Sequence, residues 1–336
     1  MTTLHIGVDI AKASFAGACW KNGSGSRWGA FTNDAEGFQE LCKRVDAERE
    51  PDETVHLVLE PTGGYELALV LFAREQGWTV YLPNPARARA WAVSKGRRGK
   101  TDAMDALTLA QYGYEQKPHP QPEMPTRLQE MENLLRRKDD LERMLRQERN
   151  RQQSLGGRPG VPDAVTGSID RVIEALEEDL EKIQEAIDEF MGQHEDLKAE
   201  ARRLLTVPGV GEKNVLYILA LLYRWSVLTQ GKGQAKSLVA LVGLDPKPYQ
   251  SGTSVWKAAS ISRMGNREMR RRLYLSALGG IRGDNALRRF YDHLLEENKK
   301  KKVALVAAAR KVLVWSWAVY RQGCAFDPTR VLPATA

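Results

Sequence analysis

The sequence predicts an α/β N-terminal domain, then a long helical hairpin and a mainly α-helical C-terminal domain. Up to residue 115, short apolar runs alternate with helical patterns, as is typical of α/β domains. A proline-rich stretch at 117–125 follows, and such a composition forms a semi-rigid linker. The predicted domain bounds are 1–118, 126–200 and 201–336. A chain of 336 residues is long enough for several domains that each bury a core.

The first domain is predicted to contain a mixed sheet. Four apolar runs are typical of strands, namely Leu4–Val8, Ser14–Trp20, Val55–Leu59 and Trp78–Leu82. Helical patterns cover Ala35–Val45, Tyr65–Gln76, a segment from Asn84-Pro85, and Asp102 to about Glu115. Proline suits the first turn of the third of these helices. The early strands resemble a meander and the later ones resemble crossovers, so both parallel and antiparallel pairs are expected.

The middle segment is predicted to be an antiparallel helical hairpin. Thr126-x-x-Gln129 has the pattern of a capping box before a helix that runs to about Gln153, and the segment Leu155–Gly167 breaks it. A second helix, Ser168–His194, has apolar residues spaced alternately four and three apart, which predicts a coiled-coil seam. Residues 168–200 hold twelve acids and three bases. We therefore expect this arm to serve spacing or assembly and not to lie along DNA.

Composition bounds the partners and the compartment. The net charge of +7 and the isoelectric point near 9.2 favour a polyanionic partner, because each neutralised phosphate releases counterions. The three cysteines lie far apart without metal-ligand spacing, as in proteins of a reducing compartment. The N-terminus has no signal-peptide pattern, and no apolar run is long enough to suggest a membrane span. The expected location is the cytosol of a bacterium or archaeon, in association with the nucleoid and without a membrane partner.

Four carboxylates stand where a metal site is expected. Asp9 ends the first strand and Glu60 ends the strand after the first helix, while Asp102 and Asp105 are three residues apart and therefore share one helix face. Oxygen ligands suit Mg²⁺, and two such ions about 4 Å apart can act on both reacting oxygens of a phosphodiester. Any one of these acids alone is more simply a cap or a solvated residue. Together they predict a site for two Mg²⁺ ions.

Two basic segments are candidate nucleic-acid contacts. The loop 95–100 lies just before Asp102 and carries four bases, which are Lys95, Arg97, Arg98 and Lys100. A second group near the C-terminus comprises Lys257, Arg263, Arg267, Arg270, Arg271 and Arg272. Such residues can hold phosphates, although a solvated surface or internal ion pairs would explain them as well. Val207-Pro-Gly-Val-Gly211 is either a phosphate-binding helix-hairpin-helix turn or only a tight interhelical turn.

Ser251 is a candidate nucleophile. It lies in the segment 243–254, which is predicted to be a loop because of its proline and glycine content. A helix start with Asn266 as its cap follows. A loop serine is usually a turn residue, but the bases that follow this one could hold DNA while the hydroxyl attacks a phosphate. No histidine lies in this motif. Tyr249 and Ser254 are rival nucleophiles in the same loop.

Nearly the whole chain resembles the DEDD-type insertion-sequence transposases, the one-ten and eleven-eleven group, whose members are also called bridge-RNA recombinases. The matching N-terminal motifs are Gly7-Val-Asp9-Ile-Ala-Lys12, Glu60-Pro-Thr-Gly-Gly-Tyr65, Asn84-Pro and Lys100-Thr-Asp102-Ala-Met-Asp105-Ala. The matching C-terminal motifs are Pro208-Gly-Val-Gly211, Gly243-Leu-x-Pro, Tyr249-x-Ser251-Gly and Gly265-Asn-x-x-x-Arg270. Each motif is weak alone, but their order makes the set specific.

This resemblance implies an RNase-H-like domain of the RuvC type, with Asp9, Glu60, Asp102 and Asp105 as the Mg²⁺-binding tetrad. It also implies a C-terminal transposase domain in which Ser251 becomes covalently joined to DNA. Further implications are donor and target DNA as substrates, a structured non-coding guide RNA encoded by the element, and a dimer or tetramer with shared active sites.

Three functions remain open at this point. The first is a recombinase that exchanges strands through a phosphoserine. The second is a metal-dependent nuclease similar to Holliday-junction resolvases, which would use water and would not need Ser251. The third is a non-catalytic nucleic-acid-binding protein with structural acids, but it leaves the acidic tetrad of a basic protein unexplained.

Overall fold

The computed structural model describes residues 2–96, 102–251 and 255–330. The chain forms two compact units, residues 1–123 and 124–336. The boundary between the two units falls within the predicted proline-rich linker. The predicted arm and C-terminal domain lie together in the second unit. Part of the linker packs on the first unit, because Gln121 donates its backbone N–H to the Val80 carbonyl and Arg74 donates to the carbonyls of Gln121 and Pro122.

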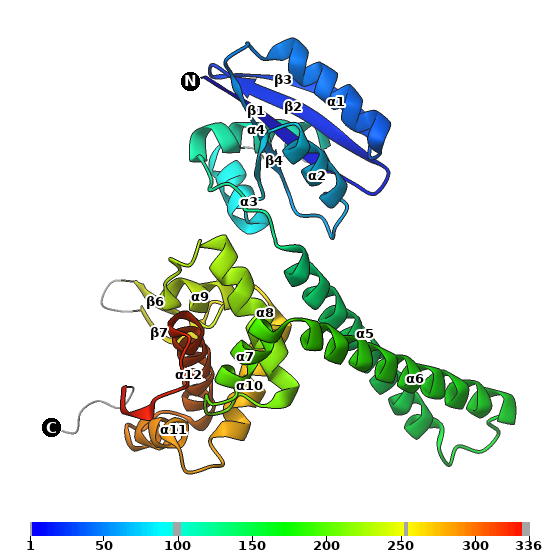
Figure 1. Ribbon diagram of the computed structural model, residues 1–336, viewed down its shortest axis with the longest axis vertical. Coiled ribbons are helices and arrows are strands. Elements are labelled where there is room, and N and C mark those ends of the chain that lie inside the picture. The colour runs from blue at the N-terminus through cyan, green and yellow to red at the C-terminus, as the bar shows by residue number, and fades with distance from the viewer. Residues whose placement is uncertain (1, 97–101, 252–254, 331–336) are drawn as a thin grey trace. The chain divides into compact units, whose positions relative to one another are not determined.

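Unit 1 contains a mixed five-stranded sheet (Figure 1). Its strands are β1 (Thr3–Ile10), β2 (Ser14–Lys21), β3 (Ser24–Thr32), β4 (Thr54–Leu59) and β5 (Thr79–Tyr81). The order across the sheet is β3-β2-β1-β4-β5; β1, β2 and β3 are antiparallel neighbours, and β4 pairs in parallel with β1 and β5. The mixed sheet is therefore confirmed. This order, three antiparallel strands followed by two parallel ones, is that of an RNase-H-like fold.

Strand β3 was not among the predicted strands. It lies at the edge of the sheet, and none of its residues is buried. An edge strand that buries neither face has no apolar alternation to reveal it. Asn22-Gly23 forms the turn before it, with positive φ at both residues, as hairpin turns require.

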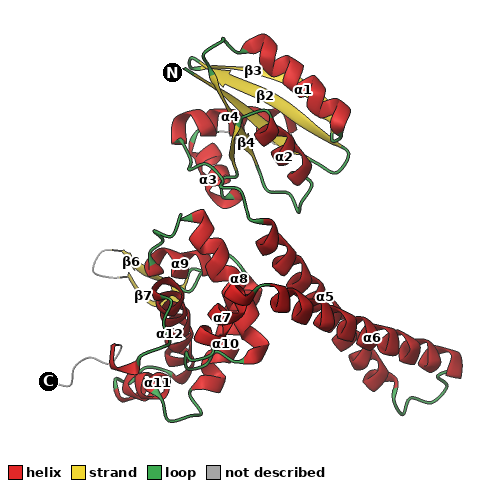
Figure 2. Cartoon of the chain, viewed as in Figure 1, coloured by secondary structure: helices red, strands yellow, loops and turns green. Residues whose placement is uncertain are grey.

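Helices cover both faces of the sheet (Figure 2). On one face, α1 (Ala35–Glu48) and α2 (Leu67–Glu75) pack against the side chains of Leu4, Ile6 and Val8. On the other face lie α4 (Asp102–Gln116) and α3 (Pro85–Ser94). Alternate residues of a strand point to opposite faces, so the odd-numbered residues of β1, which include Asp9, point to the side of α4.

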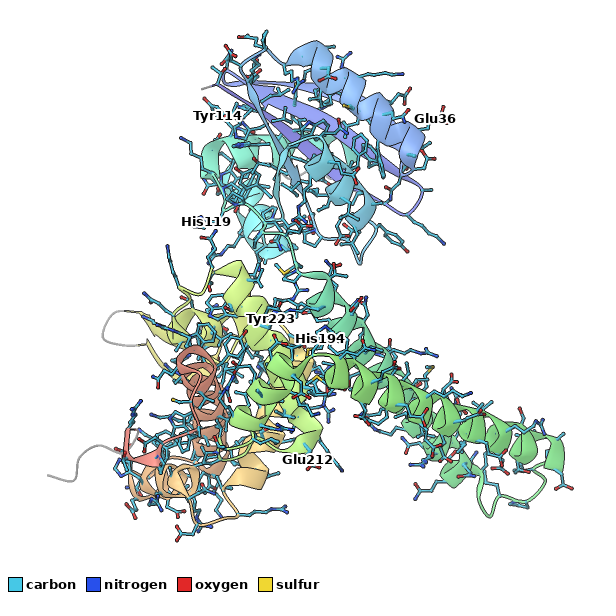
Figure 3. The ribbon with its side chains drawn as sticks, in the orientation of Figure 1. Glu36, Tyr114, His119, His194, Glu212 and Tyr223 are labelled. Carbon is cyan, nitrogen blue, oxygen red and sulfur yellow. The ribbon has the colours of Figure 1, made fainter. Side chains whose placement is uncertain are left out.

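Unit 2 is helical apart from one hairpin. Its elements are α5 (Thr126–Leu155), α6 (Asp163–Gln193), α7 (Glu195–Leu204), α8 (Glu212–Leu228), α9 (Ala235–Val242), β6 (Pro246–Ser251), β7 (Val255–Ile261), α10 (Arg267–Gly280), α11 (Ala286–Glu296), α12 (Lys301–Gln322) and the 3-10 turn Pro328–Arg330. One apolar core joins residues of α5–α10 with α11 and α12. Tyr223 of α8, labelled in Figure 3, accepts a hydrogen bond from Arg127 of α5 at 2.6 Å.

The two long helices form the predicted pair, with differences at their ends. The capping box is wrong: Thr126 is the first helical residue, Pro125 occupies the cap position without a side-chain hydrogen bond, and Gln129 donates to the Met124 carbonyl instead. Helix α6 begins earlier than predicted, at Asp163. Ion pairs such as Arg149–Glu177 join the two helices. Coiled-coil geometry along this pair stays a prediction.

Helix α12 corrects the expectation about long apolar runs. Its 22 residues are long and apolar enough to cross a membrane by length and composition. Most of its apolar side chains are instead buried in the core of unit 2, among them Ala308, Val312 and Trp317. The apolar character of this helix is therefore explained by packing within the protein.

Candidate active site

Asp9 and Glu60 lie side by side at the ends of two neighbouring strands. β1 and β4 are parallel, with Gly7 opposite Val58 and Val8 opposite Leu59. Asp9 and Glu60 follow directly in this register. Carboxyl ends of parallel strands meet at one edge of a sheet, where ligands of open α/β sheets bind. Both residues are partly exposed, so their carboxylates are accessible from this edge.

Helix α4 lies in direct contact with the middle of β1. A Cβ atom on Gly7 would be 1.9 Å from the carbonyl oxygen of Ala106 and 2.3 Å from the nitrogen of Ala110. Both distances are far below any allowed contact, so only glycine permits the two backbones to approach so closely. Gly7 therefore fixes the distance between the strand that carries Asp9 and the helix that carries the acidic pair.

The direction of α4 places its first turn near the end of β1. A Cβ on Gly113 would lie 3.3 Å from His5 and 2.5 Å from Val58, so the later part of the helix lies over the earlier part of the strands. The helix thus runs antiparallel to β1, and its beginning approaches the end of that strand. Asp105, one residue before the Gly7 contact, is directed toward the same region as Asp9.

Three of the four predicted carboxylates line one cavity of about 1000 Å³. They are Asp9, Glu60 and Asp105. Asp102 begins α4 one turn before Asp105, but its side chain lies outside the described residues. The remaining wall is formed by residues of β2, β3, α3, α4 and the segment after β4, including Thr62, Arg89, Thr108 and Tyr112. The structure thus brings together residues that are far apart in the sequence.

The loops around the cavity are held by specific hydrogen bonds. The buried carboxylate of Glu66 accepts the backbone N–H groups of Thr62 and Gly64, each at 3.0 Å. Asn33 donates to the carbonyl of Ala11, just after β1, and to that of Tyr65. These bonds fix the segments that follow Asp9 and Glu60. The carboxylate of Glu66 makes charge-assisted hydrogen bonds, which are stronger than neutral ones, and the amide of Asn33 adds two donors that support the cavity wall.

The ligand chemistry of this cavity fits a hard divalent cation. Carboxylate oxygens suit Mg²⁺, whereas a zinc site would be expected to contain histidine or cysteine. Within the described residues, no three side chains of aspartate, glutamate, histidine or cysteine are already arranged around a metal position. Asp9 and Asp105 both have interactions with other groups.

The basic loop before α4 is described only at its start. Arg97, Arg98 and Lys100 lie outside the described residues. Lys95 forms an ion pair with Glu115 at 2.6 Å and lies over the ring of Trp91. Lys95 is thus engaged by α3 and α4, and its role as a phosphate contact stays a prediction together with that of the other three.

Ser251 lies at the tip of a β-hairpin, where a loop was predicted. It is the last residue of β6 and pairs with Val255, the first residue of β7. Its side chain, that of Tyr249 and the whole of Ser254 are outside the described residues. Two prolines in β6 concealed the strand, since proline is tolerated only at strand edges or irregularities. The register shift between Lys247 and Tyr249 is such an irregularity.

The base of this hairpin is clamped by Arg270. Its guanidinium donates to the carbonyls of Val242, Met264 and Gly265 at 3.0–3.2 Å. These carbonyls flank the hairpin on both sides in sequence. Asn266 caps α10 by accepting from the N–H groups of residues 268 and 269, as predicted. The motif Gly265-Asn-x-x-x-Arg270 therefore supports the base of the hairpin. Arg270, which was predicted to contact nucleic acid, is engaged here by backbone carbonyls.

The other C-terminal bases fall into two groups. Arg272 is 9% exposed at its side chain, pairs with Asp139 of α5 and lies 3.4 Å over the Tyr217 ring. These contacts argue for a structural role and against a nucleic-acid contact. Arg271 pairs with Glu268 at the surface. Arg263 and Arg267 are exposed, and Lys257 has no described side chain, so these bases remain candidates for nucleic-acid contact.

The turn between α7 and α8 is packed on one side. Gly209 has φ +93°, and a Cβ there would lie 2.7 Å from the Ser276 carbonyl of α10. The glycine is thus required by close packing between helices, in favour of the tight-turn interpretation. Gly211, which caps α8, is exposed, so a phosphate contact at that helix end stays a prediction.

The comparison with known proteins agrees with these features. A transposase family model of the DEDD type from IS110 elements matches residues 6–155, and the model of the transposase IS116/IS110/IS902 family matches residues 201–292. A pilin gene-inverting protein of Moraxella lacunata is 32% identical over 329 residues, which are 97% of this chain and 98% of that protein. The chain belongs to the IS110 family of DEDD transposases. The predicted resemblance is confirmed.

Two further relatives define how widely the similarity extends. The pilin gene-inverting protein of Moraxella bovis is also 32% identical, over 335 residues. The insertion element IS110 uncharacterized 43.6 kDa protein of Streptomyces coelicolor is 28% identical over 176 residues, which are 48% of this chain and 40% of that protein. This transposase is therefore an enzyme that acts on DNA, and its first unit has the RNase-H-like fold expected of the DEDD type.

Sequence reasoning missed a residue that orders a loop beside the cavity and a residue of the cavity wall. Glu66 orders the loop after Glu60. The only sequence signal for this loop is the glycine pair Gly63-Gly64, whose residues both have positive φ. Arg89 lines the cavity from α3. It stands in an alternating Arg-Ala segment that shows no helical amphipathicity, so nothing in the sequence distinguished it from Arg87.

Proposed function

We propose that this transposase cleaves and rejoins DNA strands through a covalent phosphoserine at Ser251, with Mg²⁺ bound by Asp9, Glu60, Asp102 and Asp105. The observation that carries the proposal is the single cavity that Asp9, Glu60 and Asp105 share at one edge of the sheet. Its donors match the cation that phosphodiester chemistry uses. The two DNA-inverting relatives, similar over nearly the whole chain, support recombination as the outcome.

The bound cations would polarise the scissile phosphate and stabilise charge on the reacting oxygens. In the proposed step the Ser251 Oγ attacks phosphorus, its proton passes to solvent, and the bond from phosphorus to one sugar oxygen breaks. That sugar oxygen leaves and takes up a proton. A hydroxyl of another DNA strand then attacks the phosphoserine and releases the serine. The number of phosphodiester bonds is conserved, so rejoining requires no external energy source.

Ser251 is suited to this role by its position. It stands at the end of β6, and the hairpin base is held by Arg270 and by the packing of Gly243 against Met264. A nucleophile at the tip of a supported hairpin can be presented to a bound strand. Because Ser251 and the carboxylates belong to different units, the proposal requires them to meet around DNA, within one subunit or across two subunits of a dimer or tetramer.

A structured guide RNA is included in the proposal because of the family resemblance. The exposed bases Arg263, Arg267 and Arg271 and the loop 95–100 are the proposed contacts to DNA or RNA backbone. The alternative function is a nuclease that uses the same carboxylates to activate water. It predicts free hydrolytic ends and full activity without Ser251.

The deciding experiment compares wild type with Ser251→Ala and with Asp102→Asn/Asp105→Asn. We expect wild type to form a protein–DNA adduct and recombinant product with Mg²⁺. Ser251→Ala should bind DNA and Mg²⁺ normally but form neither adduct nor product, because no other hydroxyl replaces the nucleophile. The double variant should lose strand cleavage entirely.

Mass spectrometry of the trapped adduct identifies the attached residue. Tyr249→Phe is the matched control, and it should retain adduct formation. Attachment at Tyr249 or Ser254, or recombination by Ser251→Ala, would remove Ser251 from the mechanism. Cleavage by the double aspartate variant would remove the metal assignment. RNA that copurifies with the protein and is encoded beside its gene would support the guided reaction, and recombination by RNA-free protein would contradict it.

A further inference from the structure

One arginine lies among the carboxylates that line the cavity of unit 1. Arg89, on α3, is a lining residue together with Asp9, Glu60 and Asp105. It is exposed to solvent. Among the ion pairs of the described residues, none involves Arg89, whereas nearby Lys95 is paired with Glu115. The cavity therefore combines an acidic wall with a cation that no described carboxylate neutralises.

The face of α3 that borders the cavity is otherwise small and apolar. The lining residues of this helix are Pro85, Ala86, Ala88, Arg89, Ala92 and Val93. Their spacing of three and four places them on one side of the helix. No bulky side chain on this face obstructs the guanidinium, so a ligand in the cavity can approach it. Arg87, on the same helix, does not line the cavity.

The helix that carries Arg89 is held firmly. Asn84 caps it by accepting the N–H groups of Ala86 and Arg87 at 3.0 and 3.3 Å. Ala88, the neighbour of Arg89, is buried against Val58 and Tyr112. Trp91 makes an edge-to-face contact with Tyr112 of α4, with ring centroids 5.4 Å apart. These contacts fix the base of the Arg89 side chain relative to α4, which carries Asp105.

We propose that Arg89 binds a non-bridging oxygen of the phosphodiester that is cleaved. The proposal rests on the proposed function, because the cavity has to receive a scissile phosphate. A phosphate brought next to several carboxylates is repelled by them. Cations bound by the acids would offset part of this repulsion, and the guanidinium of Arg89 supplies a further positive charge in the same cavity. Its planar donors match two phosphate oxygens, a geometry that lysine does not reproduce.

The test uses Arg89→Ala, Arg89→Lys and, as matched control, Arg87→Ala on the same helix. Cleavage rates are measured on DNA with a normal scissile linkage and on DNA with one uncharged methylphosphonate at that linkage. On normal DNA, Arg89→Ala should be slower by about 10²-fold, as found when one donor to a developing charge is removed. Arg89→Lys should recover only part of this loss, and Arg87→Ala should equal wild type.

The methylphosphonate distinguishes phosphate recognition from a structural effect. Without the charge, and with one non-bridging oxygen replaced by methyl, the rates of wild type and Arg89→Ala should differ much less on this DNA than on normal DNA. Thermal unfolding with and without Mg²⁺ provides a readout independent of activity, and Arg89→Ala should keep the stabilisation by Mg²⁺. The salt slope of its DNA binding, measured in EDTA, should fall by about 1 because one phosphate contact is lost.

Three results would overturn the assignment. They are a wild-type cleavage rate in Arg89→Ala, an undiminished difference on methylphosphonate DNA, and loss of the Mg²⁺ stabilisation, which would make Arg89 a support of the carboxylate wall. The proposed function fails separately, by the absence of a serine adduct in wild type. Cleavage by water would still report on Arg89, because both rates are compared at the same linkage.

Discussion

At the scale of single residues, Gly7 determines the distance between strand and helix at the cavity. We predict that Gly7→Ala destabilises the protein by about 3 kcal/mol, since a Cβ 1.9 Å from the Ala106 carbonyl has to push α4 away, and overpacking costs about 1–3 kcal/mol or more. The variant should also lose most DNA cleavage, because Asp105 moves with the helix. Thermal unfolding and a cleavage assay measure the two effects.

Gly192→Ala is the control for this substitution. Gly192 is exposed on α6, and a Cβ there meets nothing within 4 Å. Alanine in a helix is more favourable than glycine by about 1 kcal/mol, so this variant should be at least as stable as wild type and fully active. Equal stability of Gly7→Ala and wild type would contradict the described contact between β1 and α4.

His5 is predicted to make unit 1 sensitive to acid. Burial, followed by the neighbouring charge of His56, lowers the pKa of His5 from 6.5 to about 4. The unfolded chain therefore binds the proton more readily than the folded one below pH 6.5. The sign follows from linkage: stability is full above pH 6.5 and decreases as the pH falls toward 4, by at most about 3 kcal/mol.

Denaturant unfolding at pH 7, 5.5 and 4 measures this decrease. His5→Gln is the comparison, because glutamine keeps a polar side chain but does not titrate in this range. Its stability should change less between pH 6.5 and 4 than that of wild type. Equal pH dependence of the two proteins would show that other groups, such as the carboxylates, account for acid sensitivity.

At the scale of elements, α10 shows how one basic helix divides between support and surface. We predict that Arg272→Ala lowers the free energy of unfolding by about 3 kcal/mol, because it removes the cation from the partly buried carboxylate of Asp139 and leaves it only the hydrogen bond from Tyr217. Arg271→Ala should change stability by less than about 1 kcal/mol, since its pair with Glu268 is exposed. Urea unfolding of both variants measures the contrast.

The double variant Arg272→Ala/Asp139→Ala tests the pairing itself. If the two groups interact, the cost of the double change is smaller than the sum of the single costs. Additive costs would show that Arg272 acts through its other contacts, which are the Tyr217 ring, Glu268 and Asn214. The result also bears on nucleic-acid binding. Of the two neighbouring arginines, Arg271 is exposed and can reach a phosphate, whereas Arg272 is buried.

At the scale of the whole molecule, each of the two units contains its own core. We therefore predict that calorimetry resolves two unfolding transitions and that Mg²⁺ raises only the one of unit 1. At a concentration of 100 times the Kd, binding stabilises by about 2.7 kcal/mol, which corresponds to about 10 °C for a domain of this size. Asp9→Asn/Glu60→Gln should abolish the increment.

The separately expressed segment 1–123 serves to assign the transitions. Its unfolding temperature should match that of one of the two transitions of the full chain, and Mg²⁺ should raise it by the same increment. A shift of the other transition by Mg²⁺, or no shift in wild type, would contradict a cation site formed by the carboxylates of unit 1.

The sequence alone determined the strands that bury a face and the order of the acidic motifs. The apolar runs of β1, β2, β4 and β5 are recognisable because burial imposes a local pattern of side chains. Asp9 and Glu60 can be grouped from their motifs because strand ends of a parallel pair meet at one edge, and the cavity contains both together with Asp105 of α4. Their role as metal ligands stays a prediction, as does the role of Ser251 as nucleophile.

Only the tertiary structure decided which side of each element is covered. Strand β3 and the Ser251 hairpin are held by pairing between segments, which leaves no periodic pattern in a polar or proline-containing strand. Arg270 and Arg272 resemble surface charge in the sequence, but their partners are backbone carbonyls and Asp139, far away in the sequence. Arg89 resembles Arg87, and only its place on the cavity wall separates them. Local sequence encodes the pattern of one element, whereas the partner of a charge depends on contacts that folding brings together.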